Sequence, residues 1–144
     1  MIEQDTVRLL RECDAGAKMG IEAICGVLKD VKSGGLRELL TGSKDEHEAL
    51  AGDIRDHLNR FEDQGKDPPA AVSAMSRLKT KAELMMNPGD RTVADLMTDG
   101  CGMGVKSLSK YLNRYKAADE RSKDYAKKLI AMEDRLTKEL RPYL

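Results

Sequence analysis

Histidine and glutamate are the residue types in this 144-residue chain whose positions most strongly suggest chemistry. His47 and Glu133 both fall on the apolar stripes of predicted helices, where burying a charge requires a partner. Three interpretations stay open. Both side chains reach solvent, or they form a buried ion pair, which we favour, or they belong to a mononuclear metal site completed by Asp134, Glu22, Cys101 or water.

Two pairs of glycines interrupt segments that otherwise have the pattern of helices. The stretch GAKMGIEAI in the first half of the chain returns as GCGMGVKSL in the second half. A glycine inside a helix costs about 1 kcal/mol relative to alanine, and glycines four positions apart leave bare backbone on one helix face. We expect close helix packing at all four glycines, Gly16, Gly20, Gly100 and Gly104. The second glycine of each pair is expected to make room for His47 and Glu133.

The pattern of apolar residues predicts helices throughout the chain. Apolar residues recur every three or four positions in four long segments, at about 5–32, 36–61, 91–116 and 119–142. A shorter helix is predicted at 70–86, between the breaks DQGKDPP and NPGD. The chain has no Trp and one Phe, which also disfavours a sheet. We expect one all-α domain over residues 1–144, with a hairpin at 5–64, a crossover at 65–90 and a hairpin at 91–144.

The two hairpins repeat one pattern. Displacing the sequence by 84 residues places Gly20 on Gly104, and displacing it by 86 residues places His47 on Glu133. The chain is therefore expected to contain two copies of one helical hairpin, which together form a four-helix bundle with a pseudo-two-fold axis.

Two related hairpins, a long crossover and the GKDPP break after the second helix resemble the ferritin-like superfamily, in particular its small bacterial members. The resemblance implies an up-down four-helix bundle. In metal-binding members it also implies a glutamate on the first and third helices and Glu-x-x-His on the second and fourth. Here the corresponding positions are Gly20 and Gly104, Lys44 lies three residues before His47, and no histidine follows Glu133 at the required spacing. We therefore expect a degenerate metal site.

Composition limits the other classes of function. Lys and Arg number 25 and so do Asp and Glu, so no net field favours binding to nucleic acid. The start MIEQDTVRLLREC lacks the features of a leader, and no apolar run could span a membrane, so we expect no membrane association and a cytoplasmic location. Three cysteines, an odd number, are expected to be reduced and mostly buried.

The methionines admit two interpretations. Together with the cysteines they could bind Cu(I), but methionine at helical spacing usually fills a core, and we favour that interpretation. The methionines concerned are Met19, Met85, Met86, Met97, Met103 and Met132.

From these patterns we expect a non-enzymatic ferritin-like bundle with a structural, stress-related or partner-binding role and no cofactor. Its partner would be a second copy of the chain or another protein. The alternative is a metal-binding ferritin-like protein with an atypical centre near His47 and Glu133 that holds iron, manganese or zinc.

Overall fold

The computed structural model describes residues 2–144, and within them the chain forms five α-helices, a final turn of 3₁₀ helix and no strand. The elements are α1 (Ile2–Leu28), α2 (Gly34–Asn59), α3 (Ala70–Met86), α4 (Asp90–Arg114), α5 (Glu120–Leu140) and η1 (Arg141–Tyr143). The all-α prediction is confirmed, and the short helix has the predicted bounds.

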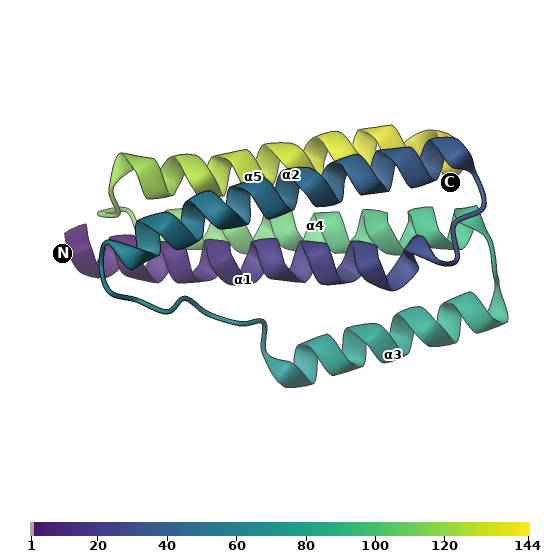
Figure 1. Cartoon of the computed structure of the whole chain (residues 1–144), viewed down its shortest axis with the longest axis horizontal. Coiled ribbons are helices and arrows are strands. Elements are labelled where there is room, and N and C mark those ends of the chain that lie inside the picture. Colours follow the sequence, from purple (N-terminus) through teal and green to yellow (C-terminus); the bar gives the residue numbers. More distant parts are fainter. Residues whose placement is uncertain (1) are drawn as a thin grey trace.

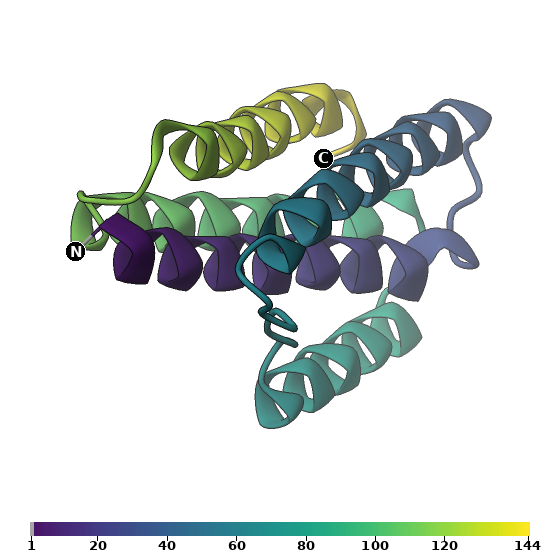
Figure 2. The same ribbon diagram turned by 60° about the vertical axis from the view of Figure 1, so that its left-hand side comes forward.

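Four of the helices form a bundle, and α3 lies along its outside (Figure 1). α1 packs antiparallel to α2, and α4 packs antiparallel to α5, while the crossover that contains α3 runs back along the bundle before α4 begins (Figure 2). As a result α2 and α4 run in the same direction. The up-down alternation expected for the four long helices is therefore broken at this point, because a crossover that spans the bundle returns the chain to the end where α2 began.

Two hydrophobic clusters make up the core, one toward each end of the bundle. The first contains Leu9, Leu10, Cys13, Ala17, Leu50, Ala51, Ile54, Leu58, Leu108, Ala118, Tyr125, Ala126 and Leu129. The second contains Ile24, Val27, Val31, Leu36, Leu40, Leu84, Val93, Ala94, Met97, Cys101, Leu136 and Leu140. In each of the four long helices, a glycine or a polar residue lies on the core side between the two clusters: Gly20, His47, Gly104 and Glu133. We call this layer the waist.

The turn between α1 and α2 differs from the prediction. The sequence SGG was expected to separate the two helices, but α1 ends earlier, at Leu28, and both glycines lie in the first turn of α2. Ser33 is the N-cap of α2, and its hydroxyl accepts a hydrogen bond from the backbone N–H of Leu36 at 3.3 Å. Asp90 accepts hydrogen bonds from the backbone N–H groups of Lys32 and Ser33. The Ser33 cap and the Asp90 carboxylate thus hold the turn in place, and the two glycines are part of α2 instead of separating the helices.

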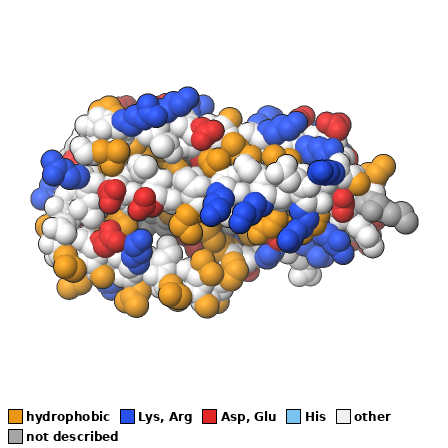
Figure 3. Space-filling model, turned by 180° about the vertical axis from the view of Figure 1, so that it is seen from behind, with side chains coloured by type: hydrophobic (Ala, Val, Ile, Leu, Met, Phe, Trp, Pro, Cys, Tyr) orange, Lys and Arg blue, Asp and Glu red, His pale blue; other side chains and the backbone are white. Residues whose placement is uncertain are grey.

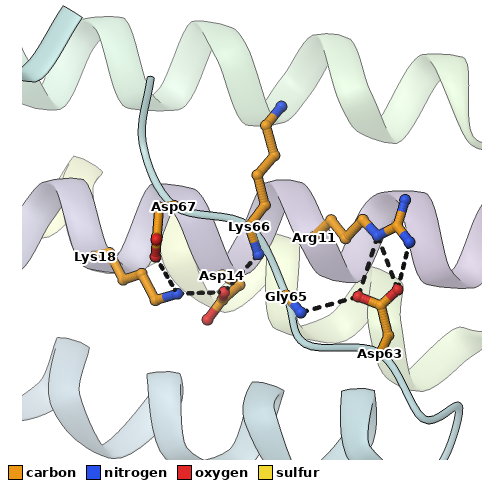
Figure 4. Close-up of polar contacts among 7 residues, drawn as sticks. All are labelled: Arg11, Asp14, Lys18, Asp63, Gly65, Lys66 and Asp67. Carbon is orange, nitrogen blue, oxygen red and sulfur yellow. Dashed lines mark hydrogen bonds and ion pairs between the residues drawn. The ribbon is translucent and has the colours of Figure 1, made fainter. Parts of the chain in front are cut away.

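The segment after α2 is held against α1 by buried Asp14 (Figure 4). Its Oδ2 accepts hydrogen bonds from the backbone N–H of Lys66 at 2.9 Å and from Lys18 Nζ at 2.8 Å. Lys18 Nζ also lies 2.9 Å from Asp67 Oδ1. These contacts hold the beginning of the crossover against α1.

A second set of contacts bends the same segment. Arg11 Nε lies 2.9 Å from Asp63 Oδ2, and the other oxygen of Asp63 accepts from the backbone N–H of Gly65. The guanidinium of Arg11 holds the pKa of Asp63 below its usual range, against the raising effect of burial. Gly65 adopts a φ of +83°, a conformation that side chains disfavour, and its α-carbon faces the Asp14 carboxylate so closely that a methyl group there would overlap it.

We predict that Gly65→Ala lowers the free energy of unfolding by about 2 kcal/mol, because it adds left-handed strain and displaces Asp14. Urea denaturation followed by circular dichroism measures the change. Gly65→Asn separates the two causes, since asparagine tolerates positive φ but carries the same β-carbon. A neutral Gly65→Asn would show that the segment does not lie against Asp14 as described.

The methionines do not all fill the core. Met97 is buried, but Met19, Met85, Met86 and Met103 are exposed, so core filling is the wrong interpretation for these four. Among the cysteines, Cys13 and Cys101 are buried and Cys25 is exposed. Among residues 2–144, no helix combines the length and the apolar character that crossing a bilayer requires.

Candidate functional site

The waist brings His47 of α2 and Glu133 of α5 face to face. His47 Nε2 lies 3.7 Å from Glu133 Oε1, and the two side chains are 1% and 9% exposed. His47 Nδ1 lies 2.7 Å from the backbone carbonyl oxygen of Ser43. Because a carbonyl oxygen only accepts, Nδ1 carries a hydrogen and Nε2 is the nitrogen that faces the carboxylate. The imidazole and the carboxylate face each other across the core at a distance longer than a direct hydrogen bond, and the contact is an ion pair when His47 is protonated.

The two glycines of the waist lie against these side chains. A β-carbon built on Gly20 would lie 2.8 Å from His47 Cδ2, and one on Gly104 would overlap the Glu133 carboxylate. Each hairpin therefore has the same arrangement, in which a glycine on its first helix leaves space for a polar side chain on its second.

The other two glycines of the repeated stretch behave differently. A β-carbon on Gly16 would touch Leu108 at 3.8 Å, which is an ordinary packing distance, and one on Gly100 would meet nothing within 4 Å among the described residues. Close packing at Gly100 is therefore a wrong prediction, because this glycine lies on the exposed side of α4.

Burial and the neighbouring charge both act on the waist pair. Burial lowers the pKa of His47, but Glu133 and the Ser43 carbonyl outweigh it, and the pKa is raised above its usual value. Burial raises the pKa of Glu133, and His47 offsets only part of this effect. One shift favours the imidazolium and the other favours the neutral acid. His47 therefore holds its proton to a higher pH than a free imidazole does, because Glu133 faces it.

These shifts predict how stability depends on pH. A raised pKa means that the folded chain binds the proton more tightly than the unfolded chain does. The contribution of His47 is therefore complete below the unfolded value of 6.5 and fades as pH rises through the folded pKa. We expect the free energy of unfolding to fall between about pH 6 and about pH 8.5, and to fall less in His47→Gln. Urea denaturation at both pH values measures the change in unfolding free energy of each protein. An equal change in the unmodified protein and in His47→Gln would contradict the prediction.

The waist does not supply the ligands of a ferritin-like metal centre. His47 and Glu133 are two donors, and glycines occupy the positions where the first and third helices would supply carboxylates. Asp134, one of the residues expected to complete a mononuclear site, is exposed, and Glu22 accepts a hydrogen bond from Ser73 Oγ at 3.3 Å, near the crossover.

Cys101, the remaining residue considered for such a site, is buried. Burial and the Glu133 carboxylate raise the pKa of its thiol to about 12, so the thiolate that binds metals is disfavoured. Within residues 2–144 no three His, Cys, Asp or Glu side chains converge on a point that could hold a metal ion. The residues present therefore do not fit a two-metal centre.

A second histidine–carboxylate pair, which sequence reasoning missed, lies in the half of the bundle that holds the first cluster. His57 Nε2 lies 3.0 Å from Asp119 Oδ2. Asp119 is the N-cap of α5, its other oxygen accepts from the backbone N–H of Ser122, and its own N–H donates to Thr6 Oγ1. Burial raises the pKa of Asp119, but the hydrogen bonds from Ser122 and His57 outweigh it and lower the pKa. The position of His57 on the apolar stripe was the signal for a buried partner.

Comparison with known proteins adds no relative. The chain matches no protein-family model, no curated protein and no solved structure. Its function must therefore be inferred from the waist, the surface and the arrangement of its helices.

Proposed function

We propose that this protein is a ferritin-like bundle in which a buried His–Glu pair stands where metal-binding members hold their metals, and that it works by binding another protein. It is non-enzymatic under this proposal. The residues that would perform chemistry, His47 and Glu133, serve instead to determine how the four helices align.

Two features support the ferritin-like assignment. The contact of Gly20 with His47 in the first hairpin has a counterpart in the contact of Gly104 with Glu133 in the second, as expected for a duplicated hairpin. The parallel course of α2 and α4 matches a bundle with one long crossover, the connection found in ferritin-like folds.

The observation that carries the binding role is the orientation of α3. Its apolar residues at helical spacing point away from the bundle: Ala71, Met75, Leu78, Ala82 and Met85, which we call the α3 stripe. The opposite side of the helix, with Ser73 and buried Leu84, faces α1 and α4. Hydrophobic side chains gather along the lower edge of the molecule in Figure 3, where α3 lies. An apolar helix face that a folded chain leaves in water is typical of a protein-binding surface.

Site-specific photo-crosslinking tests this role. A photoreactive residue at position 78 is compared with one at position 103, because Leu78 and Met103 are both 69% exposed and Met103 lies outside the stripe. We expect position 78, and not position 103, to crosslink a different protein in the cell, and the two purified proteins to bind directly with an affinity that Leu78→Gln weakens. Equal crosslinking from both positions, or no adduct from position 78, would contradict the proposal.

The alternative function, binding of a single metal ion at the waist, has one observation in its favour. His47 Nε2 and Glu133 Oε2 are buried and have no hydrogen-bond partner within residues 2–144. Elemental analysis of protein purified without a chelator distinguishes the two functions. The proposed role predicts far less than one ion per chain. About one iron, manganese or zinc ion per chain that disappears in His47→Leu would support the alternative.

A further inference from the structure

The α3 stripe has the spacing of a helix–helix seam. Its residues follow one another at intervals of four, three, four and three, which is the pattern of the core positions of a coiled coil. Met75, Leu78 and Met85 are 72%, 69% and 79% exposed, so the seam has no partner within residues 2–144. Methionine is flexible and polarisable, and it suits a surface that receives another helix.

Basic side chains border this seam on both sides. Lys79 follows Leu78 on one side, at the position equivalent to e of a heptad, and Lys81 precedes Ala82 on the other, at the position equivalent to g. Both are exposed; Lys79 Nζ lies 3.9 Å from Glu83 Oε1 of the next turn, with 62% of its side chain still in solvent. The exposed residues of α3 thus include three basic ones, Arg77, Lys79 and Lys81, while its acidic residue, Glu83, is half-buried. Charges at these border positions select the partner of a helix.

We propose that α3 binds an amphipathic helix of another protein that carries aspartate and glutamate on both sides of its own apolar stripe. This inference rests on the proposed function and names the chemistry of the partner. The apolar residues of the partner cover the α3 stripe, and its carboxylates lie against Lys79 and Lys81.

The same charges disfavour a second copy of this chain as the occupant. In an antiparallel pair of α3 helices related by a two-fold axis, each edge faces the identical edge of the other copy. Such a pair would bring Lys79 close to Lys79 of the second copy, and Lys81 close to Lys81. An acidic helix replaces both repulsions with attractions.

Two synthetic helical peptides test the proposal with the whole protein. They share leucines at the seam spacing, and one has glutamates and the other lysines at the bordering positions. Calorimetric titration should show that the glutamate peptide binds roughly tenfold more tightly than the lysine peptide, since two border pairs change from attraction to repulsion. This preference should shrink as salt is raised. Equal binding of both peptides, or no binding of the glutamate peptide, overturns the proposal.

Three variants sharpen the test, and each substitutes an exposed residue. Lys79→Glu combined with Lys81→Glu should reverse the preference between the peptides, while Leu78→Gln should weaken binding of the glutamate peptide by roughly tenfold. Met103→Gln, the matched control on α4, should change neither. A loss of peptide binding in Met103→Gln equal to that in Leu78→Gln would overturn the assignment to α3.

Two further measurements identify other occupants. Sedimentation that shows a dimer of this chain abolished by Leu78→Gln, or binding to anionic phospholipid vesicles abolished by the same change, would overturn the proposal. The crosslinking experiment distinguishes failure of the acidic-helix proposal from failure of the protein-binding function. A directly binding partner protein whose contacting helix is not acidic would leave the proposed function standing and overturn this inference, whereas the lack of any partner protein would remove both.

Discussion

Replacement of His47 by leucine should lower the free energy of unfolding by roughly 3 kcal/mol at neutral pH. The variant leaves the carboxylate of Glu133 buried in the waist, 9% exposed, without the imidazole that faces it. Removing one member of a buried pair is costly because the remaining charge is not solvated. Urea denaturation monitored by circular dichroism measures the difference.

The double variant His47→Leu, Glu133→Leu serves as the control. Two leucines leave no buried charge, so most of the lost stability should return. A loss below about 0.5 kcal/mol in the single variant, or a double variant no more stable than the single one, would show that the two side chains do not interact in the core.

The second large effect concerns the glycines of α1. Gly20→Ala should destabilise the protein by about 1–3 kcal/mol, because its β-carbon would lie 2.8 Å from the His47 ring in a packed layer. Gly26→Ala in the same helix should stabilise it by up to about 1 kcal/mol, since that β-carbon meets nothing within 4 Å among the described residues and alanine favours the helix.

The same contrast in stability is expected on α4. Gly104→Ala should destabilise the protein because its β-carbon would displace Glu133, whereas Gly102→Ala should not, because its β-carbon meets nothing within 4 Å among residues 2–144. Thermal and urea denaturation of the four variants give the comparison. If alanine stabilised the protein equally at Gly20 and Gly26, the glycines of the waist would have no packing role.

The core of the bundle could be predicted from the sequence because, on the four long helices, the apolar residues at helical spacing are mostly buried. The stripe positions of the second helix show this: Leu40, His47, Leu50 and Ile54 are all buried. The common level of His47 and Gly20, and of Glu133 and Gly104, could be predicted as well, because each pair lies about equally far from its turn and helices rise by the same distance per residue. That His47 and Glu133 face each other was the favoured one of three interpretations, and the structure confirms their contact.

Other features required the coordinates because they depend on contacts between distant segments. Asp14 pairs with the backbone of Lys66, and His57 pairs with Asp119, across separations that no local pattern encodes. Helical spacing reveals an apolar stripe on α3 but not whether it faces the bundle or the solvent. That orientation is determined by the crossover contacts and by burial of Leu84 in the core.

The central claim is that the waist contains an ionised His47 facing Glu133, and nuclear magnetic resonance titration of the imidazole nitrogens tests it most directly. We predict a pKa for His47 above 6.5 in the native protein, because Glu133 and the Ser43 carbonyl favour the imidazolium, and a lower pKa in Glu133→Gln. A His47 pKa below 6.5 that Glu133→Gln leaves unchanged would contradict the claim.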